Sequence, residues 1–223
     1  MLEMAEIKAC IFDLDGVIVD TAAHHFVAWS HLADELGVEF SKEDNENLKG
    51  VSRVDSLEYI LNKGGLVLDA MTKLQLMDRK NELYLELANQ TTKDDLLPGI
   101  EAFLIELKNL GIRIGLGSSS KNAPMILELL GITSFFQSVV DGNRITLSKP
   151  DPEVFLMGAK ELAVQVNQCL VFEDAQSGID AANAGGFHVI GVGDAKTLNG
   201  AKAVIPGFHQ MNWHSILHLL RGE

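Results

Sequence analysis

Acidic side chains directly follow apolar runs at two distant places in the chain. Asp13 and Asp15 come after the run IKACIF, and Glu173 and Asp174 end the run CLVFED. Carboxylates held a few ångströms apart repel one another, so either some are protonated or a cation lies among them. Oxygen ligands suit Mg²⁺, which keeps coordination positions open for water and phosphate oxygens. The four acids therefore predict magnesium-dependent chemistry on a phosphate, provided that the fold brings them together.

Hydroxyl and amino groups follow two further segments. Ser118, Ser119 and Ser120 come after IRIGLG, and Lys149 stands in the sequence SKP beyond FFQSVV. A positive charge and hydrogen-bond donors are what a bound phosphate needs. Taken singly, each feature has a plainer explanation, because a serine run often caps a helix and a Lys-Pro pair usually lies on the surface. Their joint placement after successive apolar runs favours phosphoryl transfer.

The spacing of Asp13 and Asp15 suggests a division of labour. One carboxylate can attack phosphorus as a nucleophile. The other, two residues further on, can exchange a proton with the attacking or leaving oxygen as a general acid/base. Gly16 lets the chain turn away without placing a side chain in the crevice.

The elements that must position these residues alternate regularly after Pro98–Gly99. Strands are expected at 7–12, 112–117, 135–140, 169–174 and 187–193, with helices between the later ones. Such alternation predicts right-handed crossovers and a parallel sheet. The expected fold is α/β, a doubly wound, Rossmann-like parallel-sheet core formed by residues 1–20 and 93–223. Ligands of such sheets bind beyond the carboxyl ends of the strands, where the acids and serines stand.

Residues 21–92 have a different pattern. Apolar residues recur there at helical spacing with almost no strand signal, and glycines separate the segments. The sequence therefore predicts a helical cap domain, 21–92, inserted after the first strand. The C-terminal segment HQMNWHSILHLL is expected to form one further packing helix.

The composition of the chain limits the classes of partner that we expect for it. The chain has 223 residues and a net charge of −13, which disfavours nucleic acid and anionic membranes as partners. Two cysteines, Cys10 and Cys169, are too few for a disulfide framework and are expected to be buried thiols. The start MLEMAEIK lacks the apolar region of a signal peptide, and no segment is long enough to span a membrane. We therefore expect a cytoplasmic protein, with nothing that demands more than a monomer.

Other phosphate-binding motifs do not fit. The chain has no GxxxxGK[ST] motif, and Gly115–Leu116–Gly117 begins a dinucleotide fingerprint that lacks its third glycine at Ser120.

Four segments carry a family resemblance. FDLDGVIVDT, GSSSKN, SKPDPE and VFEDAQSGIDAANAGG resemble, in order, the four motifs of the haloacid dehalogenase superfamily, in its phosphotransferase branch with a helical cap. DTAAHHFVAW, LKGVSRVDSL and DRKNELY, together with SSSKN, resemble a narrower group of isomerases within it. That group interconverts β-D-glucose 1-phosphate and glucose 6-phosphate. Ser119 and Ala23 depart from the narrower pattern, which often has alanine at the first position and a larger residue at the second.

The resemblance implies roles for the core residues. Asp13 would become an aspartyl phosphate, and Asp15 would act as general acid/base while its backbone carbonyl joins the Mg²⁺ shell. Glu173 and Asp174 would complete the metal ligands. Two groups would hold the transferring phosphoryl group: Ser118 and Lys149. The loop around the substrate phosphate would be formed by Ser119, Ser120, Lys121 and Asn122.

It also implies roles for the cap. Arg53 would bind the distal, non-reacting phosphate together with the loop Gly50, Val51 and Ser52. The sugar side of the cleft would be shaped by His25, Trp29 and Lys80, and Thr21 would lie at the hinge.

The expected function is that of a phosphomutase working through phospho-Asp13 and a β-glucose 1,6-bisphosphate intermediate, which also primes the enzyme. The first alternative is a magnesium-dependent sugar-phosphate or phosphoglycolate phosphatase of the same superfamily. A dehalogenase needs no Mg²⁺, so Asp15, Glu173 and Asp174 count against it. A non-catalytic binding module would be expected to have lost an acid, and all four are present.

Overall fold

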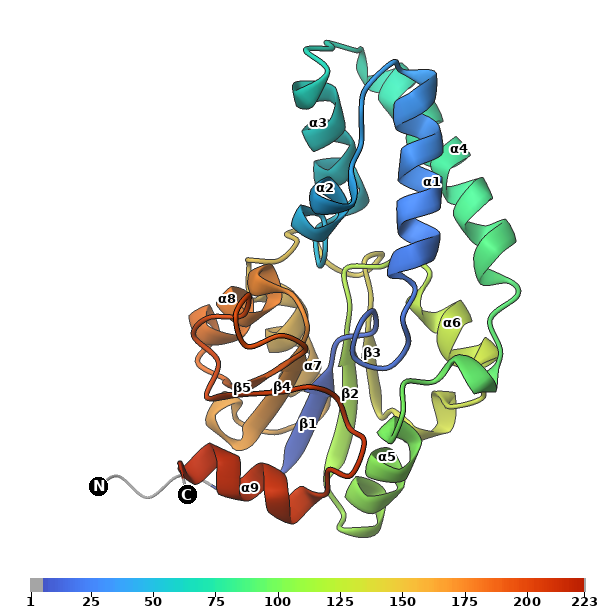
Figure 1. The fold of residues 1–223 in the computed structure, drawn as a ribbon. Helices are drawn as coiled ribbons and strands as arrows, with labels where there is room; N and C mark the ends of the chain where they lie inside the picture. Colours follow the sequence, from blue (N-terminus) through green and yellow to red (C-terminus); the bar gives the residue numbers. More distant parts are fainter. Residues whose placement is uncertain (1–5, 223) are drawn as a thin grey trace.

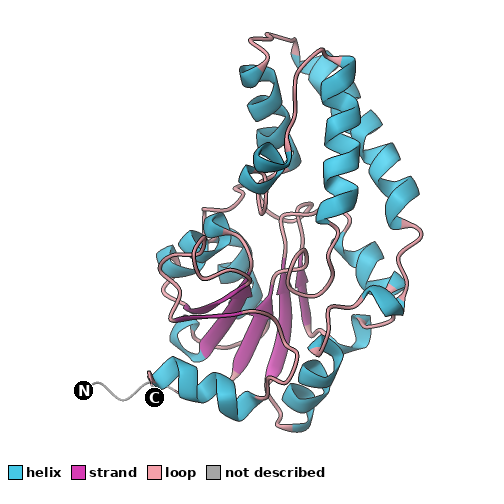
Figure 2. Cartoon of the chain, viewed as in Figure 1, coloured by secondary structure: helices cyan, strands magenta, loops and turns pink. Residues whose placement is uncertain are grey.

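The computed structural model describes residues 6–222, so the first five residues of the expected core lie outside the described part. Six parallel strands form one sheet in the order β3-β2-β1-β4-β5-β6 (Figures 1 and 2). This arrangement confirms the predicted doubly wound parallel-sheet fold. The strands are β1 (Ala9–Phe12), β2 (Arg113–Gly117), β3 (Ser138–Val140), β4 (Cys169–Glu173), β5 (His188–Val192) and β6 (Ala203–Ile205).

The central strand β1 is apolar on both faces because helices cover both sides of the sheet. Cys10 and Phe12 belong to one buried cluster, whereas Ala9 and Ile11 belong to the other. Both cysteines are buried and free, as predicted. The strand is thus a fixed support for whatever follows Phe12.

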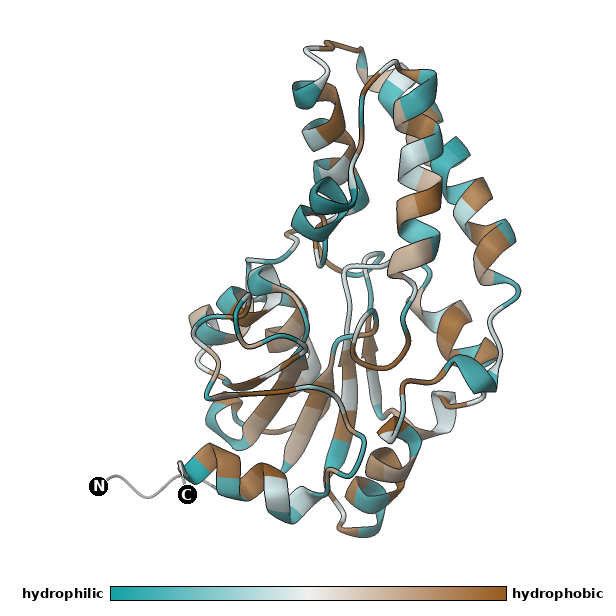
Figure 3. Ribbon diagram, viewed as in Figure 1, coloured by the Kyte–Doolittle hydropathy of each residue, from teal (hydrophilic) through white to brown (hydrophobic). Residues whose placement is uncertain are grey.

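Two helical layers enclose the sheet. The first cluster includes side chains of α5 (Ile100–Asn109), α6 (Ala123–Leu129) and α9 (Trp213–Arg221). The second includes side chains of α7 (Glu153–Glu161) and α8 (Gln176–Ala184). In Figure 3 the strands are largely brown, which marks the apolar interior between the layers. We call the sheet and these five helices the core.

Four helices between β1 and α5 stand beyond the carboxyl ends of the strands (Figure 1). We call them the cap helices: α1 (Ala22–Glu35), α2 (Lys42–Asn47), α3 (Arg53–Lys63) and α4 (Ala70–Ala88). Helices α1, α3 and α4 share a buried apolar cluster of their own, which includes Trp29, Leu57 and Leu76. The lower parts of α1 and α4 join the core cluster through Ala28 and Tyr84. The proposed domain boundaries at 20/21 and 92/93 stay a prediction.

Two details differ from the expected strands. The strand β6 was not predicted, because three residues, AVI, give too short a pattern to recognise. The strand expected at 135–140 begins only at Ser138, since Thr133–Phe135 forms a 3₁₀ turn (η2). Two further short turns of this kind are η1 (Lys93–Asp95) and η3 (Val166–Gln168). Among the described helices, none is long and apolar enough to cross a membrane.

Candidate active site

Asp13 lies where the sheet changes its winding direction. The strand β1 pairs with β2 on one side and β4 on the other, so the connections diverge at its carboxyl end. The backbone N–H of Asp13 donates to the carbonyl of Phe172 at 3.0 Å, which continues the ladder one residue past the strand. The residue Asp13 is only 4% exposed. The strand pairing therefore fixes a buried carboxylate at the bottom of the crevice.

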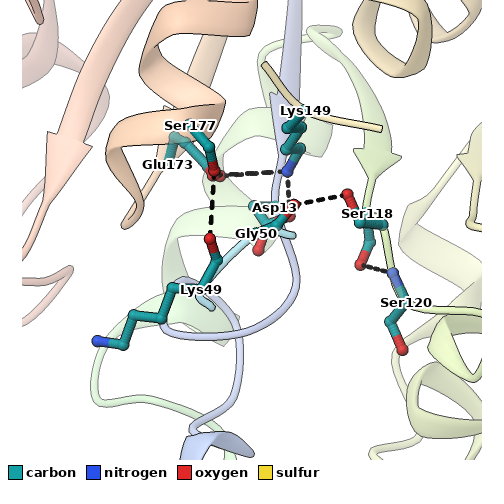
Figure 4. A network of polar contacts seen from close by, with 9 residues as sticks. Asp13, Lys49, Gly50, Ser118, Ser120, Lys149, Glu173 and Ser177 are labelled. Carbon is teal, nitrogen blue, oxygen red and sulfur yellow. Dashed lines mark hydrogen bonds and ion pairs between the residues drawn. The ribbon is translucent and has the colours of Figure 1, made fainter. Parts of the chain in front are cut away.

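Three acids from two strand ends converge there. Carboxylate oxygens of Asp13, Glu173 and Asp174 all lie within 4.8 Å of one another. Lys149 reaches the same place from the loop before α7, with its Nζ 2.5 Å from Asp13 Oδ1 and 3.5 Å from Glu173 Oε2 (Figure 4). The four side chains predicted from separate motifs are thus one charged cluster.

The cluster carries more negative than positive charge in a buried place. Burial and then the charge of Asp13 raise the pKa of Glu173 well above its ordinary range and that of Asp174 to about 7. Burial alone would lower the pKa of Lys149, but the charges of Asp13 and Glu173 raise it above its ordinary value. A second ammonium group, that of Lys49, lies 3.6 Å from Asp174 Oδ2. Two ammonium groups still do not balance three carboxylates, so a further cation would be stabilised here.

This imbalance meets the requirements of a magnesium site. The donor atoms are all oxygens, they lie close enough to share one ion, and Asp174 faces the open cleft. Asp13, Glu173 and Asp174 would hold the ion through their side chains. The predicted contribution of the Asp15 backbone carbonyl stays a prediction.

Asp15 lies outside this side-chain cluster. The hydroxyl of Thr21 donates to its Oδ1, and burial followed by the charge of Asp13 raises the pKa of Asp15 to about 7. Gly16, the residue after Asp15, has φ +75°, and a Cβ at this position would lie 2.1 Å from Asp174 Oδ2. Only glycine permits this close approach of the turn to the acid.

The loop after β2 presents the serines. Ser118 is buried, and its Oγ accepts from the backbone N–H of Ser120 at 3.1 Å. The Oγ of Ser120 in turn accepts from the N–H of Asn122 at 3.3 Å, next to α6. Ser119 points the other way and donates to the carbonyl of Gly50 in the cap at 2.9 Å. The loop thus borders the cleft and touches the cap.

Arg53, at the start of α3, is held by a neutral partner. Its Nη2 donates to Oδ1 of Asn81 at 2.7 Å, and the same oxygen accepts from Nδ2 of Asn122 at 2.9 Å. An amide oxygen orients the guanidinium without cancelling its charge. Asn81 therefore links the predicted cap cation to the core loop.

A second cation lies deeper in the cap. Lys80 is 4% exposed, its Nζ lies 3.0 Å from His25 Nδ1, and it stands 4.6 Å from the centre of the Trp29 ring. Burial and then the charge of Arg53 lower the pKa of Lys80 to about 7. Burial and then Lys80 lower the pKa of His25. The direct contacts of this amino group are therefore an imidazole and aromatic rings, while the carboxylate of Asp15 acts on it only through its charge.

One cleft of about 1580 Å³ between core and cap contains most of the predicted residues. Glu173, Lys149 and Thr21 do not line it, since they are buried behind its wall. The predicted residues that line it are Asp13, Asp15, His25, Trp29, Gly50, Val51, Ser52, Arg53, Lys80, Ser118, Ser119, Ser120, Lys121, Asn122 and Asp174. Their individual roles stay predictions.

Three polar residues of this region were not singled out from the sequence. Lys49 places its Nζ 3.6 Å from Asp174, Asn81 holds Arg53, and Ser177 donates to the carbonyl of Lys49. Lys49 lies within the segment LKGVSRVDSL and Asn81 within DRKNELY, so their position could have suggested them. Ser177 lies within the fourth motif, where no local signal distinguishes it from a helix-start serine.

The family model described as haloacid dehalogenase-like hydrolase matches residues 10–192, which is most of the chain. The chain belongs to this family. The cap helices, the cluster of acids and all of β1 except Ala9 fall within the matched range.

Individual relatives extend this result. A protein of Bacillus subtilis named β-phosphoglucomutase is 46% identical over 200 residues, which cover 89% of this chain and 88% of the relative. A crystal structure of β-phosphoglucomutase from Clostridium difficile has a TM-score of 0.93 and 41% identity, covering 97% of this chain and 98% of the other. A phosphorylated carbohydrates phosphatase of Thermotoga maritima is 29% identical over 202 residues, covering 89% and 90% of the two chains. The family therefore includes relatives named for both isomerisation and hydrolysis.

Proposed function

We propose that the chain is a phosphomutase that interconverts β-D-glucose 1-phosphate and glucose 6-phosphate through phospho-Asp13 and β-glucose 1,6-bisphosphate. The observation that carries the proposal is the presence of two separate cationic places beside one cleft. Lys149 lies against Asp13 just behind the core wall, and Arg53 lines the cap wall, where no carboxylate of the described residues forms an ion pair with it. A hydrolase of a sugar monophosphate needs a place for one phosphate, whereas a bisphosphate intermediate needs two. The strong similarity to relatives named β-phosphoglucomutase supports the same conclusion.

The first transfer makes the bisphosphate. The C6 hydroxyl oxygen of bound β-glucose 1-phosphate attacks the phosphorus of phospho-Asp13 while the bond from phosphorus to the aspartyl oxygen breaks. Asp15 takes the hydroxyl proton as general base. Lys149 and the Ser118 hydroxyl would stabilise the charge on the transferring group, because both are buried beside the place where Asp13 ends.

The second transfer uses the same groups in reverse. The bisphosphate turns over, so that the 6-phosphate lies at the distal position and the 1-phosphate faces Asp13. A carboxylate oxygen of Asp13 then attacks this phosphorus, the bond to the C1 oxygen breaks, and protonated Asp15 returns its proton to that oxygen. Glucose 6-phosphate leaves, and phospho-Asp13 is regenerated. Arg53 is suited to both orientations, since a guanidinium binds either phosphate at the distal place.

When bound by Asp13, Glu173 and Asp174, Mg²⁺ would supply neutralisation of the charge on the phosphoryl group. The protein's own task is to position the sugar and exclude water, because phosphoryl transfer depends chiefly on positioning and electrostatics. Arg53 contacts the phosphate that does not react, so its binding energy can favour the closed, aligned state.

The test is phosphorus NMR of β-glucose 1-phosphate incubated with the protein, Mg²⁺ and a trace of β-glucose 1,6-bisphosphate. The proposal expects glucose 6-phosphate to accumulate. Free phosphate alone would instead identify a sugar-phosphate phosphatase, the alternative that the Thermotoga relative represents. The cytoplasmic location and the monomeric state stay predictions.

A further inference from the structure

The cap loop between α2 and α3 is attached to the core by two serine hydroxyls. Ser119 Oγ donates to the carbonyl of Gly50 at 2.9 Å, and Ser177 Oγ donates to the carbonyl of Lys49 at 3.2 Å. The donors come from different core elements, the loop after β2 and the first turn of α8. Figure 4 shows the contact between Ser177 and Lys49 in the same view as the cluster of Asp13, Lys149 and Glu173. Two consecutive carbonyls of one loop are thus held from two sides.

The backbone of this loop lies directly against the core. Gly50 has φ +70°, and a Cβ at this position would lie 2.7 Å from Ser177 Oγ and 3.3 Å from the Cβ of Ala175. A larger residue would strain the backbone and push the loop away from α8. The close approach of Gly50 and the two hydrogen bonds are independent features, and both favour a loop that lies against the core.

The loop leads directly to the predicted phosphate-binding residue of the cap. Ser52 caps α3, and its Oγ accepts from the N–H of Asp55 at 3.1 Å, so Arg53 is the first residue of the helix. A loop seated on the core therefore fixes the start of α3 and with it the base of the Arg53 side chain.

We infer that Ser119 and Ser177 are positioning residues that seat the loop Lys49–Ser52 on the core and so limit the loss of the phosphoryl group of phospho-Asp13 to water. This inference rests on the proposed function for its consequence, although the seating itself is independent of it. In an unseated loop, water would replace the hydroxyls as donor to both carbonyls. A net hydrogen bond then changes the seated population by about twofold to tenfold, which biases the cap without locking it.

The first experiment measures the seating directly by amide hydrogen exchange. In Ser177→Ala, exchange within residues 48–54 is expected to quicken by about twofold to tenfold, and further in the Ser119→Ala/Ser177→Ala double variant. Ser215→Ala is the matched control, because the hydroxyl of Ser215 contacts Asn212, the N-terminal capping residue of the core helix α9, away from the cleft. Unchanged exchange in the loop of Ser177→Ala would overturn the inference.

The second experiment measures the consequence. Protein phosphorylated with acetyl phosphate and Mg²⁺ is followed by phosphorus NMR without sugar, and the variants are expected to lose the acyl phosphate about twofold to tenfold faster than wild type. The ratio of isomerisation to hydrolysis should fall by a similar factor, while the thermal midpoint stays that of the Ser215→Ala control. An unchanged hydrolysis rate in Ser177→Ala overturns the inference. Failure of wild-type protein to form glucose 6-phosphate overturns the proposed mutase instead.

Discussion

The charged side chains on the core wall and on the cap wall of the cleft have different kinds of partner. On the core side, Asp13 and Glu173 are buried at strand ends, and the buried Lys149 reaches them from the loop before α7 and compensates their charge. On the cap side, Arg53 is held by an amide oxygen, and Lys80 by an imidazole and aromatic rings. Among the described residues, no ion pair with a carboxylate includes either of these cap cations.

The difference indicates where each wall obtains its partner. The core acids have fewer positive charges beside them than they need for neutrality, so a metal ion would complete their charge balance. Arg53 and Lys80 have no directly bound carboxylate among the described residues, so an anionic substrate would complete their charge balance. Contacts across the cleft include hydrogen bonds donated by hydroxyl and amide groups and the partly exposed ion pair of Lys49 with Asp174, and water can replace each of them. The core wall is therefore fixed by burial, whereas the position of the cap wall is open to adjustment by what binds.

The largest effect is expected from the core. Asp13→Asn removes the attacking oxygen's charge while keeping the shape, so both the acyl phosphate and isomerisation should become undetectable. Phosphorus NMR after treatment with acetyl phosphate measures the first, and a coupled glucose 6-phosphate assay measures the second. Asp34→Asn, an exposed change on α1, serves as control. An acyl phosphate retained in Asp13→Asn would refute the nucleophile assignment.

Removal of the Arg53 charge should lower isomerisation much more than hydrolysis of phospho-Asp13. Arg53→Ala is expected to lower isomerisation by about 100-fold, because distal binding energy no longer aligns the sugar. Hydrolysis of phospho-Asp13 should change by less than about threefold, since Arg53 does not contact the reacting phosphorus. Arg53→Lys should fall between the two, because an ammonium lacks the bidentate geometry of a guanidinium. Equal loss of both activities would argue against a role confined to the distal phosphate.

The core should also show a characteristic pH dependence when metal is removed with a chelator. The pKa values of Asp15 and Asp174 are raised to about 7, so the folded state retains protons that the unfolded state has released. The free energy of unfolding should therefore fall as pH rises from about 4 to 7, by about 1.4 kcal/mol per pH unit for each such proton. Urea denaturation across this range measures the slope, and saturating Mg²⁺ should flatten it. An unfolding free energy that does not change with pH in the metal-free protein would show that folding does not raise the pKa values of Asp15 and Asp174.

The cap should show the opposite pH dependence and a smaller effect. Asp44 accepts from Ser41, Tyr59 and Lys63, and its pKa is lowered chiefly by the hydrogen bond from Lys63. This contribution is complete above the ordinary carboxylate pKa of about 4 and is lost as pH falls below it.

Asp44→Asn should accordingly cost about 1 kcal/mol of unfolding free energy at pH 7, and less at pH 3. Isomerisation should be nearly unchanged, because Asp44 does not line the cleft. Glu43→Gln, an exposed neighbour on α2, is the control. A penalty that persists undiminished at pH 3 would contradict the importance of the charge.

Local pattern in the sequence was sufficient for most of the elements. Apolar runs such as ACIF and CLVFE specify buried strands wherever they occur, and the acids that follow them must lie at one edge of a parallel sheet. The alternation of strand and helix after Pro98–Gly99 specified the doubly wound fold. The missed strand β6 shows the limit of this method, since three residues pair with β5 only because the rest of the sheet already exists.

The sequence by itself determined which chemical groups stand at the strand ends, because chain direction and strand polarity are local properties. Only the tertiary structure decided how those groups are partnered. Ser177 meets Lys49 across 128 residues, and Asn122 meets Asn81 across 41. Such contacts depend on the packing of cap against core, and the raised pKa of Asp174 depends on burial that no short segment encodes.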